Sequence, residues 1–233
     1  MFRQLFTFIY PRLCSSCERE LRDDEKHVCL HCSQDIPPFV PEQDHNDGHS
    51  LNPMFQLFWG KSDVQYATSC YQYIKGEKLQ KLVHELKYNG RKNLASYFGE
   101  MMAQEIKNNS KLCDIDAICF VPSSKQKIRV RGYNQAQELA ISISKYIDKP
   151  SLDLLMKKKN TASQTTKNVH DRHLNLEKSF SINKKLPFPP QCDHVLLIDD
   201  VITTGATLNA CAKLILSEFD VKVSVLTLAY RHV

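Results

Sequence analysis

The sequence predicts an α/β domain whose central strands are parallel and buried on both faces. Three runs rich in apolar residues, at 116–122, 194–199 and 221–230, have the length and composition of buried strands. Apolar residues at helical spacing lie between them, most clearly after Gly205. Because strand, loop and helix alternate along the chain, we expect a parallel sheet with helices on both faces.

The other expected elements follow from local patterns. In chain order they are a short helix at 2–9, a cysteine-rich module at 13–34, a strand at 64–73, helices at 79–86 and 93–106, a basic loop after Pro122, a helix at 136–147 and a strand at 152–156. The polar stretch that follows, up to about residue 174, has no clear periodicity. Ligands of such sheets bind beyond the carboxyl ends of the strands.

Composition divides the chain into a small module and one larger domain. Proline, glycine, asparagine and aspartate disfavour regular structure at 37–53, so we predict a helix and cysteine module at 1–36, a linker at 37–53 and the main domain at 54–233. The chain is 42% hydrophobic, and none of its apolar runs approaches the roughly 20 residues of a membrane helix. No signal-peptide pattern is visible, and we expect a cytoplasmic protein without membrane insertion.

Four of the nine cysteines form two C-x2-C pairs, which predict a structural metal site. Cys14 and Cys17, then Cys29 and Cys32, have the spacing of a zinc ribbon, and four thiolates leave Zn²⁺ no open position for catalysis. A redox role is the alternative interpretation, although such a motif needs only one pair. The other five lie in or beside apolar segments and are expected to be buried: Cys70, Cys113, Cys119, Cys192 and Cys211.

The stretch VLLIDDVITTGATL carries the clearest binding signal in the chain. A buried strand runs into Asp199 and Asp200, and the hydroxyl-rich turn from Thr203 to Thr207 leads into a helix. Such a turn presents free N–H groups and the positive end of a helix dipole to an anion, and Gly205 permits close approach. Sugar hydroxyls can donate to the two carboxylates, so a ribose phosphate fits. The alternative is a strand and helix cap with incidental acids.

Residues 195–207 resemble the signature of phosphoribosyltransferases. This resemblance implies a type I phosphoribosyltransferase-like sheet that binds phosphoribosyl pyrophosphate together with Mg²⁺. The residues that it assigns to the ribose phosphate are Asp199, Asp200, Thr203, Thr204, Gly205, Ala206 and Thr207.

Further motifs resemble the ComF (ComFC/GntX-like) family of competence-associated proteins. They are the VP…RGYNQ pattern at 121–135, LKYNGR at 86–91, Gln164, Arg172, Asn175 and Phe180, and the four-cysteine module. The first follows a strand as a pyrophosphate-binding loop would, with Ser123, Ser124, Lys125, Lys127 and Arg131 as candidate donors. Lys127 stands where many relatives have arginine, and Lys167 where leucine is usual, so the phosphate geometry can differ here.

The family resemblance implies a role in DNA uptake during natural transformation, with single-stranded DNA as a ligand and a helicase-like competence protein as a partner. Two basic clusters are candidate DNA contacts, namely Arg12, Arg19, Arg22 and Lys26, and then Lys87, Tyr88, Arg91 and Lys92. The alternative is an active phosphoribosyltransferase with an unknown acceptor, for which residues 161–174 are a candidate hood. The sequence identifies no catalytic residue, acceptor pocket or oligomeric state.

Overall fold

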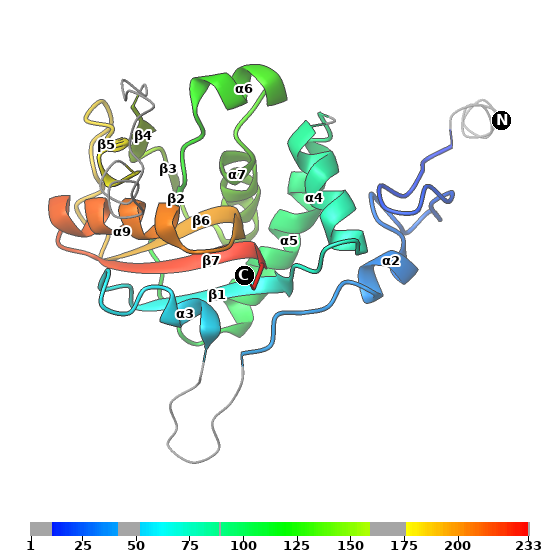
Figure 1. The fold of residues 1–233 in the computed structure, drawn as a ribbon, viewed down its shortest axis with the longest axis horizontal. Helices are drawn as coiled ribbons and strands as arrows, with labels where there is room; N and C mark the ends of the chain where they lie inside the picture. The colour runs from blue at the N-terminus through cyan, green and yellow to red at the C-terminus, as the bar shows by residue number, and fades with distance from the viewer. Residues whose placement is uncertain (1–10, 42–51, 89, 159–175, 233) are drawn as a thin grey trace, which may run out of the picture.

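The computed structural model describes residues 11–41, 52–88, 90–158 and 176–232. The helix expected at 2–9 and the candidate hood at 161–174 lie outside these residues. Figure 1 shows a sheet with helices packed on it, and the N-terminal segment extending to one side. None of the helices in the described ranges has the length and apolar character that crossing a bilayer requires.

Five parallel strands form the central sheet, in the order β1-β7-β6-β2-β3. They are β1 (Tyr66–Gln72), β2 (Ala117–Phe120), β3 (Ser151–Leu152), β6 (His194–Ile202) and β7 (Lys222–Tyr230). In the middle of the sheet, Leu197 of β6 lies opposite Cys119 on one side and Val225 on the other. These strands are apolar on both faces because helices cover both, and the predicted fold class is confirmed.

Alternate residues of the strands pack into two different cores. Even-numbered residues such as Leu196 and Ile198 pack with α4 (Lys78–Tyr88), α5 (Asn93–Asn108) and α7 (Gln135–Ile147). Odd-numbered residues such as Val195 and Leu197 pack with α9 (Ala206–Glu218), and Met54 of α3 (Pro53–Gln56) joins them. Over residues 195–198, this period of two decides which helices each side chain of β6 meets.

Two sequence predictions need correction. The expected strand at 152–156 is split, because Leu152 ends β3, whereas β4 (Leu155–Lys157) pairs antiparallel with β5 (Phe180–Ile182) in a separate sheet. The expected basic loop is a helix, α6 (Lys125–Arg131). Ser124 caps its N-terminus by accepting from the N–H of Lys127, and Gly132 ends it at a φ of 83°.

The N-terminal module shares its core with the main domain. It consists of an antiparallel bridge between Leu13 and Glu20 and the short helix α2 (Leu30–Gln34). Its apolar residues Leu21, Val28 and Ile36 belong to the same buried cluster as α4 and α5. The module is therefore packed against these helices, and the domain boundaries at 36 and 53 stay a prediction.

The cysteines outside the module differ in their burial. Cys119, Cys192 and Cys211 are buried as expected, and Cys70 is partly buried. Cys113 is exposed and its thiol donates to the carbonyl of Ser110, so the expectation of burial was wrong for this residue. It lies in the turn that precedes β2, where the chain has already left the packed end of α5.

Candidate functional site

The carboxyl ends of four parallel strands meet at one edge of the sheet. The N–H of Val121, after β2, donates to Ile198 of β6 at 3.0 Å. The N–H of Arg231, after β7, donates to Ile202 at 2.9 Å, and that of Tyr73, after β1, donates to Tyr230 at 2.7 Å. Segments that follow these strands therefore gather at one edge, where ligands of parallel sheets bind.

The two aspartates of β6 point to opposite faces of the sheet. The strand continues past them to Ile202, so its period of two applies to both side chains. Asp199 lines the cavity formed with the following turn. Asp200 is on the face of α4, where its Oδ2 lies 3.0 Å from Nζ of Lys87. Asp199 Oδ1 also accepts from the N–H of Asp200 at 2.8 Å.

The turn after β6 forms a small open pocket at the N-terminus of α9. Asp199 and residues 201–208 line a cavity of about 60 Å³, so every predicted ribose-phosphate residue except Asp200 borders it. Gly205 precedes the first residue of α9 with a φ of 71°, a conformation that other residues adopt at a cost. The side-chain amide of Asn209 stabilises the turn by donating to the carbonyls of Gly205 and Leu57.

The electrostatic environment of Asp199 is unusual for a carboxyl group. Burial and, secondly, the adjacent charge of Asp200 raise its pKa to about 7, against the lowering effects of the Asp200 N–H, Lys87 and Lys127. Burial also lowers the pKa of Lys157 on β4, and the like charge of Lys127 adds to that effect. Three lysines from separate elements therefore act on one pair of acids.

The predicted pyrophosphate residues lie around α6. Ser123 donates to Asn134 and Ser124 caps the helix, whereas Lys125 and Lys127 are exposed on its first turn. Arg131 donates to Gln135 at 2.8 Å, and also to the hydroxyl of Tyr88 at 3.2 Å. Of this group, Lys127 acts electrostatically on Asp199, which connects α6 with the strand that carries the acids.

Sequence reasoning missed the contact of Lys87 and the position of Lys157. Lys87 belongs to the LKYNGR motif of the family resemblance and was a candidate DNA contact, yet its ammonium group pairs with the carboxylate of Asp200. Lys157 belongs to a lysine run that resembles a solvated loop, but it is partly buried with its Nζ 5.1 Å from the ring centre of Phe180. The only sequence signal for the buried position of Lys87 is that it directly follows the apolar face of a helix.

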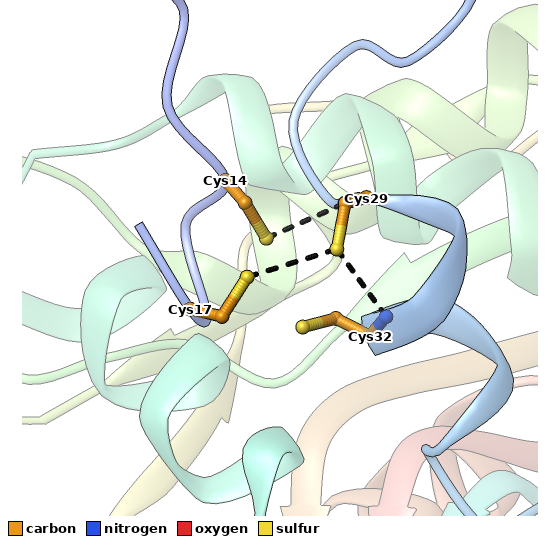
Figure 2. A group of neighbouring side chains, drawn as sticks. All are labelled: Cys14, Cys17, Cys29 and Cys32. Atoms are coloured by element: carbon orange, nitrogen blue, oxygen red, sulfur yellow. Dashed lines mark hydrogen bonds between the residues drawn. The ribbon is translucent and has the colours of Figure 1, made fainter. Parts of the chain in front are cut away.

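The four cysteines of the two C-x2-C pairs come together, as Figure 2 shows. Their Sγ atoms all lie within 4.8 Å of one another, and those of Cys17 and Cys29 are 3.7 Å apart. Four sulfurs around one zinc ion at its usual bond length would be about 3.8 Å apart. The cluster therefore fits a tetrahedral metal ion, and the redox alternative explains only one pair.

Backbone N–H groups donate hydrogen bonds to the sulfurs of Cys14 and Cys29, which favours the binding of a metal ion. Cys14 Sγ accepts from the N–H of Ser16 at 3.4 Å and of Cys29 at 3.3 Å, and Cys29 Sγ accepts from Cys32 at 3.4 Å. Burial raises the pKa of the Cys14 thiol, but N–H donors outweigh this effect and bring it to about 6. A thiol that loses its proton near neutral pH is suited to binding a cation.

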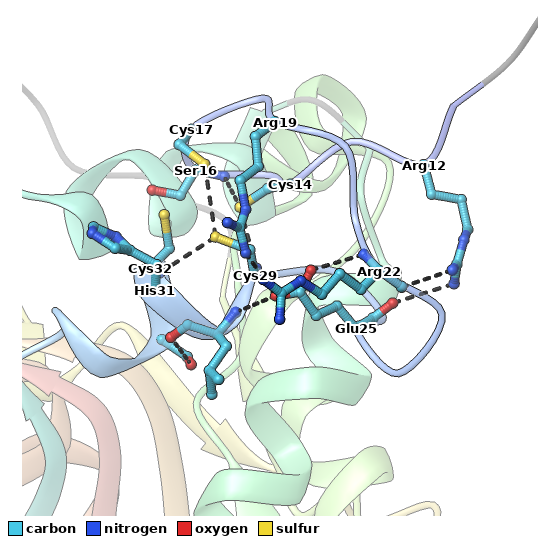
Figure 3. Close-up of polar contacts among 12 residues, drawn as sticks. Arg12, Cys14, Ser16, Cys17, Arg19, Arg22, Glu25, Cys29, His31 and Cys32 are labelled. Carbon is cyan, nitrogen blue, oxygen red and sulfur yellow. Dashed lines mark hydrogen bonds and ion pairs between the residues drawn. The ribbon is translucent and has the colours of Figure 1, made fainter. Parts of the chain in front are cut away.

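Glu25 organises the module around the cysteines, as Figure 3 shows. Its carboxylate accepts from Arg19 at 2.9 Å, from the N–H of Arg22 at 2.8 Å and from the N–H of Leu30 at 2.6 Å. The two backbone donors lower the pKa of Glu25, and the charge of Arg19 lowers it further. One buried acid thus connects the loop between the cysteine pairs to α2.

Most of the proposed DNA contacts of the module have partners within the protein. Arg12 donates to the carbonyls of Arg22 and Glu25, and Lys26 lies 4.0 Å from Glu100. Residues beyond the module are also paired: Arg91 with Ser15 and Glu85, and Lys92 with Glu138. The pair of Lys26 and Glu100 connects the module to α5, and that of Arg91 and Ser15 connects it to the segment before α5, whereas the other pairs lie within the module or within the main domain.

The fold and the site define an α/β protein with a parallel sheet and a four-cysteine module. Its central strand carries two aspartates and is followed by a turn that is suited to binding an anion. No family model matches the chain. It is 29% identical to Competence protein F of Haemophilus influenzae over 208 residues, which are 87% of this chain and 83% of that protein. It is 29% identical to Competence protein ComFC of Streptococcus pneumoniae over 84% of each chain.

A third group of relatives and two solved structures complete the comparison. DNA utilization protein YhgH of Escherichia coli K12 is 26% identical over 91% of this chain and 88% of its own length. Glutamine phosphoribosylpyrophosphate amidotransferase from B. subtilis has a TM-score of 0.41 and 14% identity, with coverage of 61% of this chain and 30% of that one. Adenine phosphoribosyltransferase from Thermoanaerobacter pseudethanolicus has a TM-score of 0.39 and 15% identity, with coverage of 67% and 88%. The chain therefore resembles the ComF competence proteins over most of its length, and the resemblance predicted from its motifs is confirmed.

Proposed function

We propose that this chain binds a ribose 5-phosphate compound, with phosphoribosyl pyrophosphate as the first candidate, in the turn after β6. The observation that carries the proposal is the shared cavity of Asp199 and the turn 203–207 at the start of a helix of 13 residues. The N–H groups and hydroxyls of the turn suit a phosphate, and the carboxylate suits sugar hydroxyls. A ribose 5-phosphate carries both a phosphate and sugar hydroxyls, so one such ligand can bind to the turn and to the carboxylate at the same time.

The diphosphate of this ligand is assigned to the segment around α6. Ser123, Ser124, Lys125, Lys127 and Arg131 offer hydroxyl and cationic donors, and Lys127 already acts on Asp199. Mg²⁺ belongs to this proposal as the companion of the diphosphate, whose charge it would neutralise. The acids of β6 would orient the sugar.

We also propose that the four cysteines hold one structural zinc ion. Sulfur ligands, tetrahedral spacing and N–H donors to the sulfurs favour Zn²⁺ over a hard cation. With four protein ligands the metal has no position for a reacting water, so its role is to hold the module together. The module then presents a rigid surface to α4 and α5.

The biological role that we propose is the handling of single-stranded DNA in the cytoplasm during natural transformation. The names of the relatives, competence proteins and DNA utilization proteins, support this role. Exposed cations on α6, namely Lys125, Lys127 and Arg129, offer phosphate contacts. A helicase-like competence protein is the proposed partner.

Transfer of the phosphoribosyl group to an acceptor is a second candidate function. It is favoured by the three lysines around the acids, Lys87, Lys127 and Lys157, since cations near the leaving diphosphate would stabilise the transition state. Release of pyrophosphate in the presence of a panel of nucleobases and amines tests this function. Release with one acceptor would support transfer, and no release with any of them would favour binding alone.

Calorimetry with phosphoribosyl pyrophosphate and Mg²⁺ tests the binding proposal. We expect heat of binding for the wild type, and its loss in Asp199→Asn and Asp200→Asn. Asp193→Asn is the matched control, because Asp193 is an exposed aspartate directly before β6, at the opposite end of the same strand. Equal binding by all four proteins would overturn the proposal.

DNA binding is tested separately by titrating oligo(dT) at several salt concentrations, since phosphate contacts must weaken as salt rises.

A further inference from the structure

A second and larger cavity adjoins the ribose-phosphate pocket on the side of α4. Its volume is about 330 Å³, at the small end of the range for ligand sites. Val201 and Thr203 line both cavities, so the two are neighbours at the edge of the sheet. The described residues that line the larger cavity are Tyr73, Gln80, Val83, His84, Lys87, Tyr88, Val201, Thr203 and Arg231.

Aromatic rings and cations line this cavity, and Arg131 lies beside them. The rings of His84 and Tyr88 are 4.8 Å apart, and Arg131 lies over the ring of Tyr88 at 5.0 Å. Arg231 lies 5.8 Å from the ring centre of Tyr73, and both residues line the cavity. Tyr88 is 48% exposed, so part of its side chain is accessible to a ligand. α4 and α6, which bring these groups together, are in contact (Figure 1).

The composition of the cavity suits a planar and neutral ring flanked by phosphates. Stacking on tyrosine needs a flat ligand with a π-face, and the cations Lys87, Arg131 and Arg231 beside these rings suit negative charge. No acidic side chain is among the described residues that line this cavity. Gln80 and Thr203 add side chains that can donate hydrogen bonds to the edge of a base.

The neighbouring ribose-phosphate pocket is a poor site for a DNA strand. A deoxyribose within a strand has no 2′-hydroxyl, and its 3′-oxygen is esterified, so it has no hydroxyl to donate to Asp199 or Asp200. DNA therefore requires a different site, and the aromatic cavity is next to the cations of α6.

We propose that the cavity between α4 and the end of β7 holds one unpaired nucleobase, stacked on Tyr88 and Tyr73. The inference rests on the proposed function and names where a nucleobase binds. The same chemistry is offered by a base within a single strand and by the base of a free nucleotide. Arg131 beside Tyr88 and Arg231 beside Tyr73 favour a strand, whose phosphates continue in both directions from the base.

Fluorescence of 2-aminopurine placed within oligo(dT) tests this proposal, because stacking on an aromatic ring quenches it. With the full chain, we expect quenching on binding to the wild type and to Tyr88→Phe, which keeps the ring. Tyr88→Leu and Tyr73→Leu should lose the quenching and weaken binding roughly 5- to 100-fold, as expected for the loss of one stacked base. Tyr146→Leu is the matched control, because this exposed tyrosine of α7 does not line the cavity.

The outcomes separate the inference from the proposed function. If the wild type binds oligo(dT) with a steep salt dependence, but the leucine variants quench and bind as it does, the cavity is not a base site and DNA binding stands. If the wild type binds neither the strand nor phosphoribosyl pyrophosphate, both proposals fail. A parallel titration with 2-aminopurine riboside monophosphate identifies the source: quenching by the strand alone supports a DNA base, and quenching by both supports a site open to free nucleotides.

Discussion

The ammonium group of Lys87 lies 3.0 Å from the carboxylate of Asp200, and both side chains are largely buried. This pair connects α4 with the strand that carries both acids. Because Asp199 precedes Asp200 directly, the lysine also reduces the repulsion between the two carboxylates. Lys87 and Tyr88 at the same helix end also border the aromatic cavity, so α4 contributes both to this cavity and to the ion pair with Asp200.

Removal of Lys87 should destabilise the protein through Asp200. Lys87→Met leaves a buried carboxylate without its cation, at a cost on the order of 1–3 kcal/mol. In the Asp200→Asn background the same substitution should cost much less, since no charge is left unpaired. Urea unfolding of both single variants and the double variant measures this coupling. Additive losses would show that the two residues do not interact in solution.

Stability should fall as pH rises from about 4 to 7, because of Asp199. Its pKa is about 7 in the folded chain against 3.8 as an ordinary carboxyl, so in this window the folded state keeps a proton that the unfolded state has lost. The folded state is therefore favoured at low pH, and the contribution is lost as the group ionises. Urea unfolding at pH 5 and pH 8 measures the change.

Because histidines titrate in the same window, the wild type must be compared with Asp199→Asn. We expect the variant to show a smaller loss of stability between pH 5 and pH 8, and Asp193→Asn to follow the wild type. An Asp199→Asn profile parallel to that of the wild type would mean that the carboxyl is already ionised at pH 5.

Gly205→Ala should distort the turn that we assign to the phosphate. A left-handed backbone costs a non-glycine residue about 1–2 kcal/mol, and an added Cβ would also meet Leu57 at 3.1 Å and Asn209 at 3.3 Å. Gly60→Ala is the control, because its φ of 66° is similar but nothing lies within 4 Å of the added atom. Thermal unfolding should show a greater loss for Gly205→Ala, and calorimetry a loss of ligand binding in that variant alone. Equal behaviour of the two variants would contradict this account of the turn.

Metal removal should release the module from α4 and α5. The four sulfurs hold segments that otherwise have only a small apolar core of Leu21, Val28 and Ile36. We expect one zinc per chain by elemental analysis, and a lower unfolding temperature after chelation or in Cys29→Ser. Cys113→Ser should change neither, because this exposed thiol lies outside the cluster. Full zinc content in Cys29→Ser would show that this cysteine is not a ligand.

The sequence predicts the buried elements of this protein better than its exposed ones. Strands β2, β6 and β7 are evident because both of their faces are apolar and because they are bounded by polar turns. The helix α6 was missed because Ile128 and Val130 alternate with charged residues, at the period of a strand. Ser124 and Gly132 at its ends were the available signals, since these residue types cap helices.

The components of the site were visible in the sequence, but their relative positions were not. Adjacent acids and a hydroxyl-rich turn mark the pocket because their spacing is local. The pairing of Lys87 with Asp200 depends on how α4 crosses the sheet, which no local pattern encodes. The same holds for the aromatic cavity, where Tyr73, Tyr88 and Arg231 come from three separate elements. Tertiary packing, rather than residue type, brings these groups together.

The most direct test of the account is a crystal structure of the protein grown with ribose 5-phosphate. We predict that the phosphate accepts hydrogen bonds from the N–H groups and hydroxyls of residues 203–207, with the sugar hydroxyls donating to the carboxylates of β6. A phosphate bound elsewhere, or the turn closed over an empty pocket at saturating ligand, would contradict the central claim.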